Sequence, residues 1–199
     1  MKMIRRHAAR LVVSALALVG ATFASARPVA AAPINLETWY EFDIIGAGPT
    51  IGCFPADPAG DFCVPSGGTP TSFAPEPSWT FTSLQPVVFT VTDAFQSGDR
   101  FEIFDFGVSL GFTSVPALRP PVNCGSDPVT CLATDGISHG VFALAAGSHA
   151  LTISSVSDNF GAAYFQASAV PEPASLVLLG SGLLGVVARV RSRGQGRMR

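Results

Sequence analysis

The sequence predicts an all-β fold: an antiparallel β-sandwich, jelly-roll-like, flanked by an N-terminal signal helix and a C-terminal transmembrane helix. Three observations lead to this prediction. The middle of the chain holds about eight short stretches of alternating apolar and polar residues, the pattern of half-buried strands. Turn residues separate these stretches, with no convincing amphipathic helix between them. Each end of the chain instead carries an uncharged apolar run beside basic residues.

The first 26 residues, 1–26, have the three-part layout of a secretory signal peptide. A basic stretch precedes an apolar run at residues 11–23, and small residues follow the run. Cleavage after Ala26 satisfies the small-x-small rule, and cleavage after Ala31 satisfies it as well. The alternative is a retained anchor helix, which the shortness of the run disfavours. We therefore expect export through the Sec translocon.

The body, residues 27–169, is expected to fold as one domain. In its first predicted strand, residues 36–44, Tyr40 and Phe42 share one face while Glu41 and Asp43 share the other, which predicts a half-buried strand. The stretch 116–135 is expected to be a loop. Further strands are expected at residues 79–84, 87–92, 100–106, 108–113, 140–144, 149–155 and 162–169.

Charge is distributed unevenly along the chain. Between residues 30 and 169 there are thirteen acidic residues and only two basic ones, Arg100 and Arg119, so the body carries a net charge of −11. The formal charge of −2 for the whole chain hides this, because the other basic residues lie near the ends. Binding to nucleic acid depends on basic residues that neutralise phosphates. Nucleic acid is therefore excluded as a partner.

All four cysteines, Cys53, Cys63, Cys124 and Cys131, lie in the exported body, where oxidation is permitted. Four cysteines allow three pairings. We expect the sequence neighbours to pair, because each neighbouring pair brackets a loop rich in Gly, Pro and Asp that a crosslink would restrain. A zinc site is the rival interpretation, but the spacings lack two-residue gaps and matching histidines.

Residues 170–199 form the second apolar segment. Fifteen uncharged residues, 174–188, extend about 23 Å as a helix, against about 30 Å of bilayer hydrocarbon. Interfacial flanking groups would complete the span, so we expect a transmembrane helix with Arg189, Arg191 and Arg193 as the membrane stop. The alternative, a buried core element, is disfavoured because the run shows no polar face at period 2 or 3.6.

A Pro-Glu-Pro element, an apolar helix and an arginine cluster follow one another at the chain's end, and together they resemble the PEP-CTERM protein-sorting signal of Gram-negative bacteria. This resemblance implies that an exosortase, a membrane-embedded cysteine transpeptidase, recognises Pro171, Glu172 and Pro173 and processes the chain near them. It also implies a transient stay in the inner membrane and delivery to the cell surface or the extracellular biofilm matrix. A permanently retained C-terminal anchor is the alternative.

The body, too, resembles a recurrent type found in exported PEP-CTERM proteins, through residues 91–105, 107–111, 146–149 and 151–153. This resemblance implies a sandwich similar to carbohydrate-binding or adhesive modules. The usual hairpin of that type reads Asp-Asn-Gly, whereas Phe106 stands in place of the Asn here. The type of this turn, and any ligand role of the hairpin, are therefore left open.

Residues suited to catalysis are sparse in the body. His139 and His149 are its only histidines, neither lies in a recognisable nucleophile motif, and Ser138 beside His139 is expected to be a coincidence. We therefore expect no catalytic residues and a structural, adhesive or carbohydrate-binding protein, with exopolysaccharide as a partner. The alternative is a secreted polysaccharide-active enzyme, which would need two carboxylates that meet across an open cleft.

No cofactor and no dedicated metal site are expected. Asp93, Asp99, Glu102 and Asp105 could together hold a structural Ca²⁺, although they lack the regular spacing of a dedicated calcium loop. The two tryptophans, Trp39 and Trp79, could stack on sugar faces. Tryptophans at strand positions more often belong to the core.

Overall fold

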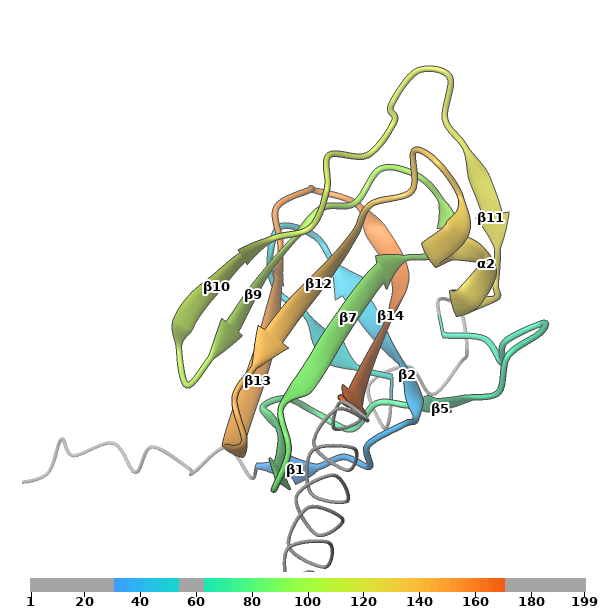
Figure 1. Ribbon diagram of the computed structural model, residues 1–199. Helices are drawn as coiled ribbons and strands as arrows, with labels where there is room; N and C mark the ends of the chain where they lie inside the picture. Colours follow the sequence, from blue (N-terminus) through green and yellow to red (C-terminus); the bar gives the residue numbers. More distant parts are fainter. Residues whose placement is uncertain (1–30, 54–62, 171–199) are drawn as a thin grey trace, which may run out of the picture. The chain divides into compact units, whose positions relative to one another are not determined.

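The computed structural model describes residues 31–53 and 63–170 (Figure 1). The chain divides into two units after Ala30, and all described residues belong to the second. The predicted signal peptide and everything from Pro171 onward, including the predicted transmembrane helix, lie outside the described residues. The elements are β1 (Ala32–Pro33), β2 (Trp39–Ile45), β3 (Gly48–Pro49), β4 (Ile51–Gly52), β5 (Thr71–Phe73), β6 (Trp79–Ser83), β7 (Val87–Asp93), β8 (Phe95–Gln96), β9 (Phe101–Asp105), β10 (Val108–Phe112), β11 (Asn123–Gly125), α2 (Pro128–Ala133), β12 (His139–Leu144), β13 (Gly147–Ser155) and β14 (Phe160–Ala169).

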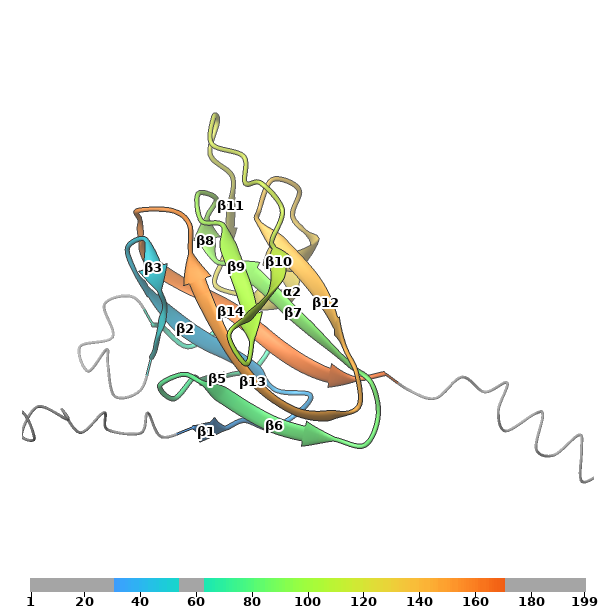
Figure 2. The same ribbon diagram turned by 90° about the vertical axis from the view of Figure 1, so that its left-hand side faces the viewer.

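The eight longer strands form two antiparallel sheets that pack face to face (Figure 2). One sheet has the order β6-β13-β9-β10 and the other β12-β7-β14-β2. Except at the β9–β10 hairpin, each of these strands is followed along the chain by one in the opposite sheet, which is how a jelly roll is wound. The predicted sandwich is therefore confirmed. The short strands β1 and β5 pair in parallel with β6 and β2, so both sheets are mixed where these strands join them.

Aromatic side chains fill the space between the two sheets. Trp79 from the first sheet meets Phe165 from the second with ring centroids 4.5 Å apart, and Phe42 meets Phe101 at 5.6 Å. In β13, alternate residues are buried, as the period of two requires. The indole N–H of Trp79 donates to the carbonyl of Pro75 at 2.7 Å, so its polar atom is satisfied in the core.

The acidic face of β2 is covered by other parts of the protein. A half-buried strand, which the sequence predicted, would instead expose this face to solvent. Glu41 and Asp43 are 0% and 4% exposed. The segment that leads to β5 packs near this face, where a Glu41 carboxylate oxygen accepts a hydrogen bond from the backbone N–H of Val64 at 3.0 Å. Alternation in a sequence shows that two faces differ, but it cannot show a further layer that covers the polar one.

That further layer also encloses a small second core. Trp39, Ala94 and Tyr164 are buried together on the outer side of the second sheet, with Phe95 and Leu132 packed against them. The Tyr164 hydroxyl donates to the carbonyl of Ser126 at 3.0 Å. Both tryptophans are thus core residues, which leaves neither of them as a sugar platform.

Helix α2 lies within the stretch that the sequence predicted as a loop, and that prediction is wrong there. Asp127 is its N-cap, with its side chain accepting from the backbone N–H of Thr130, and Pro128 begins the helix. Asp127 also accepts from the backbone N–H of Thr69 at 2.8 Å, which joins the two segments of the outer layer. Hydrogen bonds from Thr130 and Thr69 lower the pKa of Asp127 to about 2.

The two disulfides are Cys53–Cys63 and Cys124–Cys131, the sequence-neighbour pairs that we expected. Both lie in the segments that flank the second sheet. The first closes a separation of 10 residues, and the second ties β11 to α2 across 7 residues. On the chain-entropy model each closure contributes about 2 to 3 kcal/mol to stability.

The structure of the β9–β10 hairpin shows the type of the turn that contains Phe106, which the sequence left open. Asp105 pairs with Val108, and the two residues between them have φ values of 48° at Phe106 and 78° at Gly107. Two consecutive positive φ values are those of a type I′ turn, so the turn keeps the type that an Asn-Gly pair would give. The left-handed backbone is unfavourable for phenylalanine, and its side chain is 66% exposed.

Replacing Phe106 by asparagine should therefore stabilise the body. Asparagine tolerates the left-handed conformation, and the exposed ring contributes little packing, so Phe106→Asn is expected to raise the free energy of unfolding by about 0.5 to 1 kcal/mol. Urea denaturation of the exported body measures this change. Phe106→Ala is the matched control, because it removes the ring but keeps the backbone cost. Equal stability of the Asn and Ala variants would contradict the prediction.

Candidate functional site

A pocket of about 530 Å³ lies at the end of the sandwich where β7 and β13 finish and β9 and β14 begin. We call this the loop end. Its lining comes from three separate segments: residues 94–99, Leu118 and residues 158–162. The pocket's volume falls in the usual range for small-ligand sites. The lining side chains on which the argument depends are Phe95, Asp99, Leu118, Asp158, Asn159 and Phe160.

The buried carboxylate of Asp93 organises the first of these segments. One of its oxygens accepts from the backbone N–H of Ala94 at 2.9 Å, and the other accepts from those of Asp99 at 3.1 Å and Gly98 at 3.3 Å. The loop is therefore wrapped around this side chain. Burial raises the pKa of Asp93 to about 8, the nearby charge of Asp99 adds to the rise, and the three N–H donors oppose it.

Asp99 links the first segment to the third. It is 6% exposed and lines the pocket, and one of its carboxylate oxygens accepts from the side-chain amide of Asn159 at 3.1 Å. The Ser157 hydroxyl donates to the carbonyl of Gly98 at 2.9 Å, so two contacts hold the loops together. Burial raises the pKa of Asp99, and the hydrogen bond from Asn159 opposes that rise.

Two phenylalanines are among the residues that line the pocket. Phe160 is 66% exposed at the first position of β14. Phe95 has a φ of 54°, and its ring packs against the second core. A left-handed backbone at a phenylalanine costs about 1 to 2 kcal/mol, and strain of this kind often occurs at binding sites. The pocket thus combines flat apolar surfaces with carboxylate and amide groups.

The four acidic residues that the sequence suggested as calcium ligands lie in different parts of the fold. Asp93 and Asp99 are at the loop end, Glu102 accepts from the Ser109 hydroxyl at 2.6 Å, and Asp105 contacts His149. Within residues 31–53 and 63–170, no group of three or more His, Cys, Asp or Glu side chains could hold a metal ion. Calcium binding remains a prediction.

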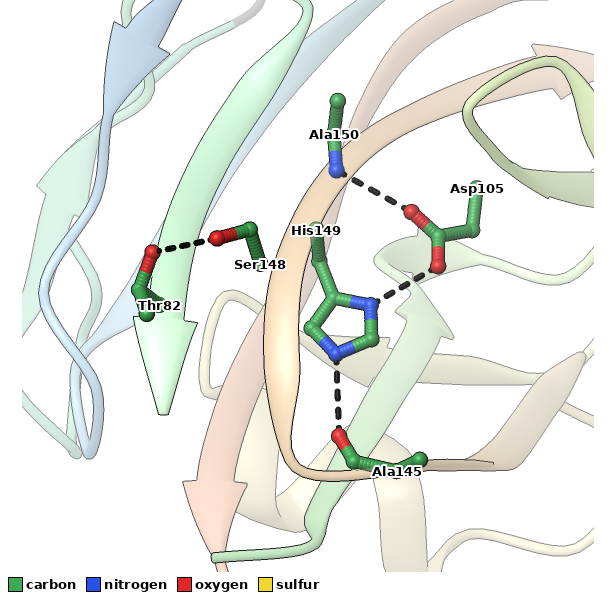
Figure 3. Close-up of polar contacts among 6 residues, drawn as sticks. All are labelled: Thr82, Asp105, Ala145, Ser148, His149 and Ala150. Carbon is green, nitrogen blue, oxygen red and sulfur yellow. Dashed lines mark hydrogen bonds and ion pairs between the residues drawn. The ribbon is translucent and has the colours of Figure 1, made fainter. Parts of the chain in front are cut away.

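A second polar cluster lies at the far end of β13 (Figure 3). A carboxylate oxygen of Asp105 is 2.7 Å from Nδ1 of His149, and the carbonyl of Ala145 is 3.0 Å from Nε2. The other oxygen of Asp105 accepts from the backbone N–H of Ala150 at 3.0 Å. Both nitrogens of this nearly buried ring already face oxygen atoms within the fold, so the cluster holds the β12–β13 turn against the β9–β10 hairpin. The neighbouring hydroxyls of Ser148 and Thr82 lie 2.9 Å from each other.

Ser138 and His139 show no nucleophile–base geometry. The Ser138 hydroxyl is fully buried and donates to the carbonyl of Ser114, while it also lies 2.7 Å from the Thr113 hydroxyl. Nδ1 of His139 lies 3.0 Å from the carbonyl of Ile137 instead. The Ser138 side chain therefore joins β12 to the segment after β10, while the His139 ring contacts only the neighbouring backbone among the hydrogen bonds of the described residues.

Comparison with known proteins adds one finding about the end of the chain. The family model for the PEP-CTERM protein-sorting motif matches residues 169–192. The chain carries a PEP-CTERM sorting motif. No curated protein and no solved structure matches the chain. The matched range contains Pro171, Glu172 and Pro173 as well as Arg189 and Arg191, while Arg193 follows it directly.

The PEP-CTERM motif implies that an exosortase is the processing partner and that the protein is exported and sorted to the cell surface. The transmembrane helix predicted within the motif lies beyond the described residues. In the part of the chain that the structure does describe, no helix is long and apolar enough to cross a membrane.

The motif and the pocket connect to opposite ends of the same strand. The strand β14 begins at Phe160 in the pocket and ends at Ala169, where the matched motif starts. Ten residues of extended chain cover about 30 Å. The backbone N–H of Val170 donates to the carbonyl of Pro86 at 2.8 Å, so the chain leaves the body beside the β6–β7 loop. Figure 2 shows β14 running between these two ends.

Proposed function

We propose that this is a non-enzymatic exported protein whose loop-end pocket binds carbohydrate of the extracellular matrix. The observation that carries the proposal is the position of the pocket, at the end of β14 opposite to the sorting motif. A body held at the cell surface through its C-terminus would present its far end outward. The pocket is at that outward end, where it would meet matrix polysaccharide.

The chemistry of the pocket supports the same proposal. Sugar rings have one or two faces of C–H groups that pack on aromatic rings, and their hydroxyls pair with carboxylates and amides. The exposed ring of Phe160 offers such a surface, and Asp99, Asp158 and Asn159 offer the polar groups beside it. The hydrogen bond between Asp99 and Asn159 holds two of these groups in place before a ligand arrives.

Replacing Phe160 by alanine tests the proposal. We expect Phe160→Ala to weaken binding of matrix oligosaccharides about tenfold, because the variant loses the stacking surface. Isothermal titration calorimetry with cellotetraose, the N-acetylglucosamine tetramer and the glucosamine tetramer would measure the affinities. Val156→Ala is the matched control, because Val156 is an exposed residue of the same loop that does not line the pocket. Absence of binding by all three sugars, or equal affinities for the two variants, would contradict the proposal.

A second candidate, glycoside hydrolysis, is favoured by one observation: burial raises the pKa of both Asp93 and Asp99. However, both oxygens of Asp93 accept backbone N–H groups, and Asp93 does not line the pocket. That arrangement suits a residue that supports a loop better than a proton donor. Release of new reducing ends during prolonged incubation with the same sugars, abolished in Asp99→Asn, would favour the enzyme.

A further inference from the structure

The ionisable residues that line the loop-end pocket are all acidic. Of the described residues that line it, the ionisable ones are Asp99 and Asp158, and none is basic. The nearest arginine in the sequence is engaged elsewhere: Nε of Arg100 donates to the carbonyl of Thr113 at 3.1 Å, and its guanidinium carbon lies 4.9 Å from the centre of the Phe112 ring. Arg119 follows the lining residue Leu118 but does not itself line the pocket.

We infer that this pocket selects sugars with a free ammonium group, that is, de-acetylated amino sugars, over neutral and anionic ones. The inference rests on the proposed function and names the class of carbohydrate. A uronic acid would bring a third negative charge beside Asp99 and Asp158 without a cation to balance it. An ammonium group would instead find two carboxylates, and it would arrive at a body whose net charge is −11.

The surroundings of Asp99 strengthen the effect of a bound cation. Asp99 as a residue is 6% exposed, so little water screens it, and one of its carboxylate oxygens is held by Asn159. Burial makes the charged form of this group unfavourable, and a positive group beside it offsets that cost. Asp158 lies one residue before Asn159 and is exposed, so the attraction that it adds can be screened by salt.

Three tetrasaccharides with related backbones test this inference: the glucosamine tetramer, the N-acetylglucosamine tetramer and cellotetraose, titrated at neutral pH and low salt. We expect the glucosamine tetramer to bind about tenfold more tightly than the other two, and we expect concentrated NaCl to reduce that ratio. Asp158→Asn should reduce the ratio by about threefold, because it should weaken binding of the glucosamine tetramer more than binding of cellotetraose. Asp158 is exposed, so the variant is expected to fold.

Asp135→Asn is the matched control, since it makes the same change of charge at an exposed position outside the pocket. Equal affinities for all three sugars, each weakened by Phe160→Ala, would overturn the amino-sugar inference and leave the proposed function intact. Binding by none of them would overturn both. A preference for glucosamine that Asp158→Asn and Asp135→Asn reduce equally would also overturn the inference, because the whole body's charge and not the pocket would then be its cause.

Discussion

Replacement of Trp79 by alanine is expected to lower the free energy of unfolding by about 3 to 5 kcal/mol, the usual cost of removing a large aromatic ring from a core. Trp79 is 0% exposed and contacts Phe42 and Phe165 of the opposite sheet. Its removal therefore opens a cavity at the place where the two sheets meet. The carbonyl of Pro75 also loses its indole donor.

Urea denaturation of the exported body, with both disulfides intact, would measure this loss. Leu84→Ala is the matched control, because Leu84 follows β6 directly and is 96% exposed. We expect that control to change the free energy of unfolding by less than about 0.5 kcal/mol. A Trp79→Ala variant that loses no more than the Leu84 control would mean that the two sheets do not pack on each other as described.

The stability of the body should also fall as the pH rises from about 4 to about 9. The pKa of Asp93 is raised to about 8 in the folded protein, from its ordinary value of 3.8. A raised carboxyl pKa contributes stability that is fully present below pH 3.8 and is lost as the pH rises through 8. A difference of this size corresponds to a loss of up to about 5 kcal/mol. Asp127 acts in the opposite window, since its lowered pKa of about 2 stabilises the fold only above that pH.

Urea denaturation at a series of pH values checks the prediction. The wild-type free energy of unfolding should decline between pH 4 and pH 9, and the decline should be much smaller in Asp93→Asn, which cannot ionise there. Asp135→Asn serves as the control, because that residue is exposed and should leave the slope as it is in the wild type. A wild-type profile that is flat over this range would show that Asp93 is ionised in the folded protein without cost.

The positions of the eight main strands could be predicted because their residues alternate. In β13, every second residue from His149 to Ser155 is buried, and the same alternation is visible in the sequence. The order of the strands in the two sheets follows from crossovers between them, which alternation does not encode. The short helix α2 was missed because six residues are too few for a helical period. Its signal was the cap itself, an aspartate followed by proline at Asp127-Pro128.

The candidate site was harder to predict, because its parts come from distant segments. Asp99 and Asn159 form a hydrogen bond across 60 residues of chain, and only the winding of β9 and β14 brings them together. The sequence instead drew attention to Trp39 and Trp79 as sugar platforms, and the structure buries both. Phe160 gave no signal of its own, since a phenylalanine that begins a strand is ordinary. The sorting motif, by contrast, was readable because all of its parts are adjacent in the chain.

The point at which the chain leaves the fold separates the folded body from the sorting motif. The strand β14 lies in the middle of its sheet, between β7 and β2, and its pairing with β7 is complete at Ala169. Cutting the chain at or after Pro171 would therefore leave intact every strand pair of β14 and every core residue in the part of the chain that the structure describes. The processed body would keep the fold that it had before cleavage. Processing would then change the location of this protein without changing the shape of its binding surfaces.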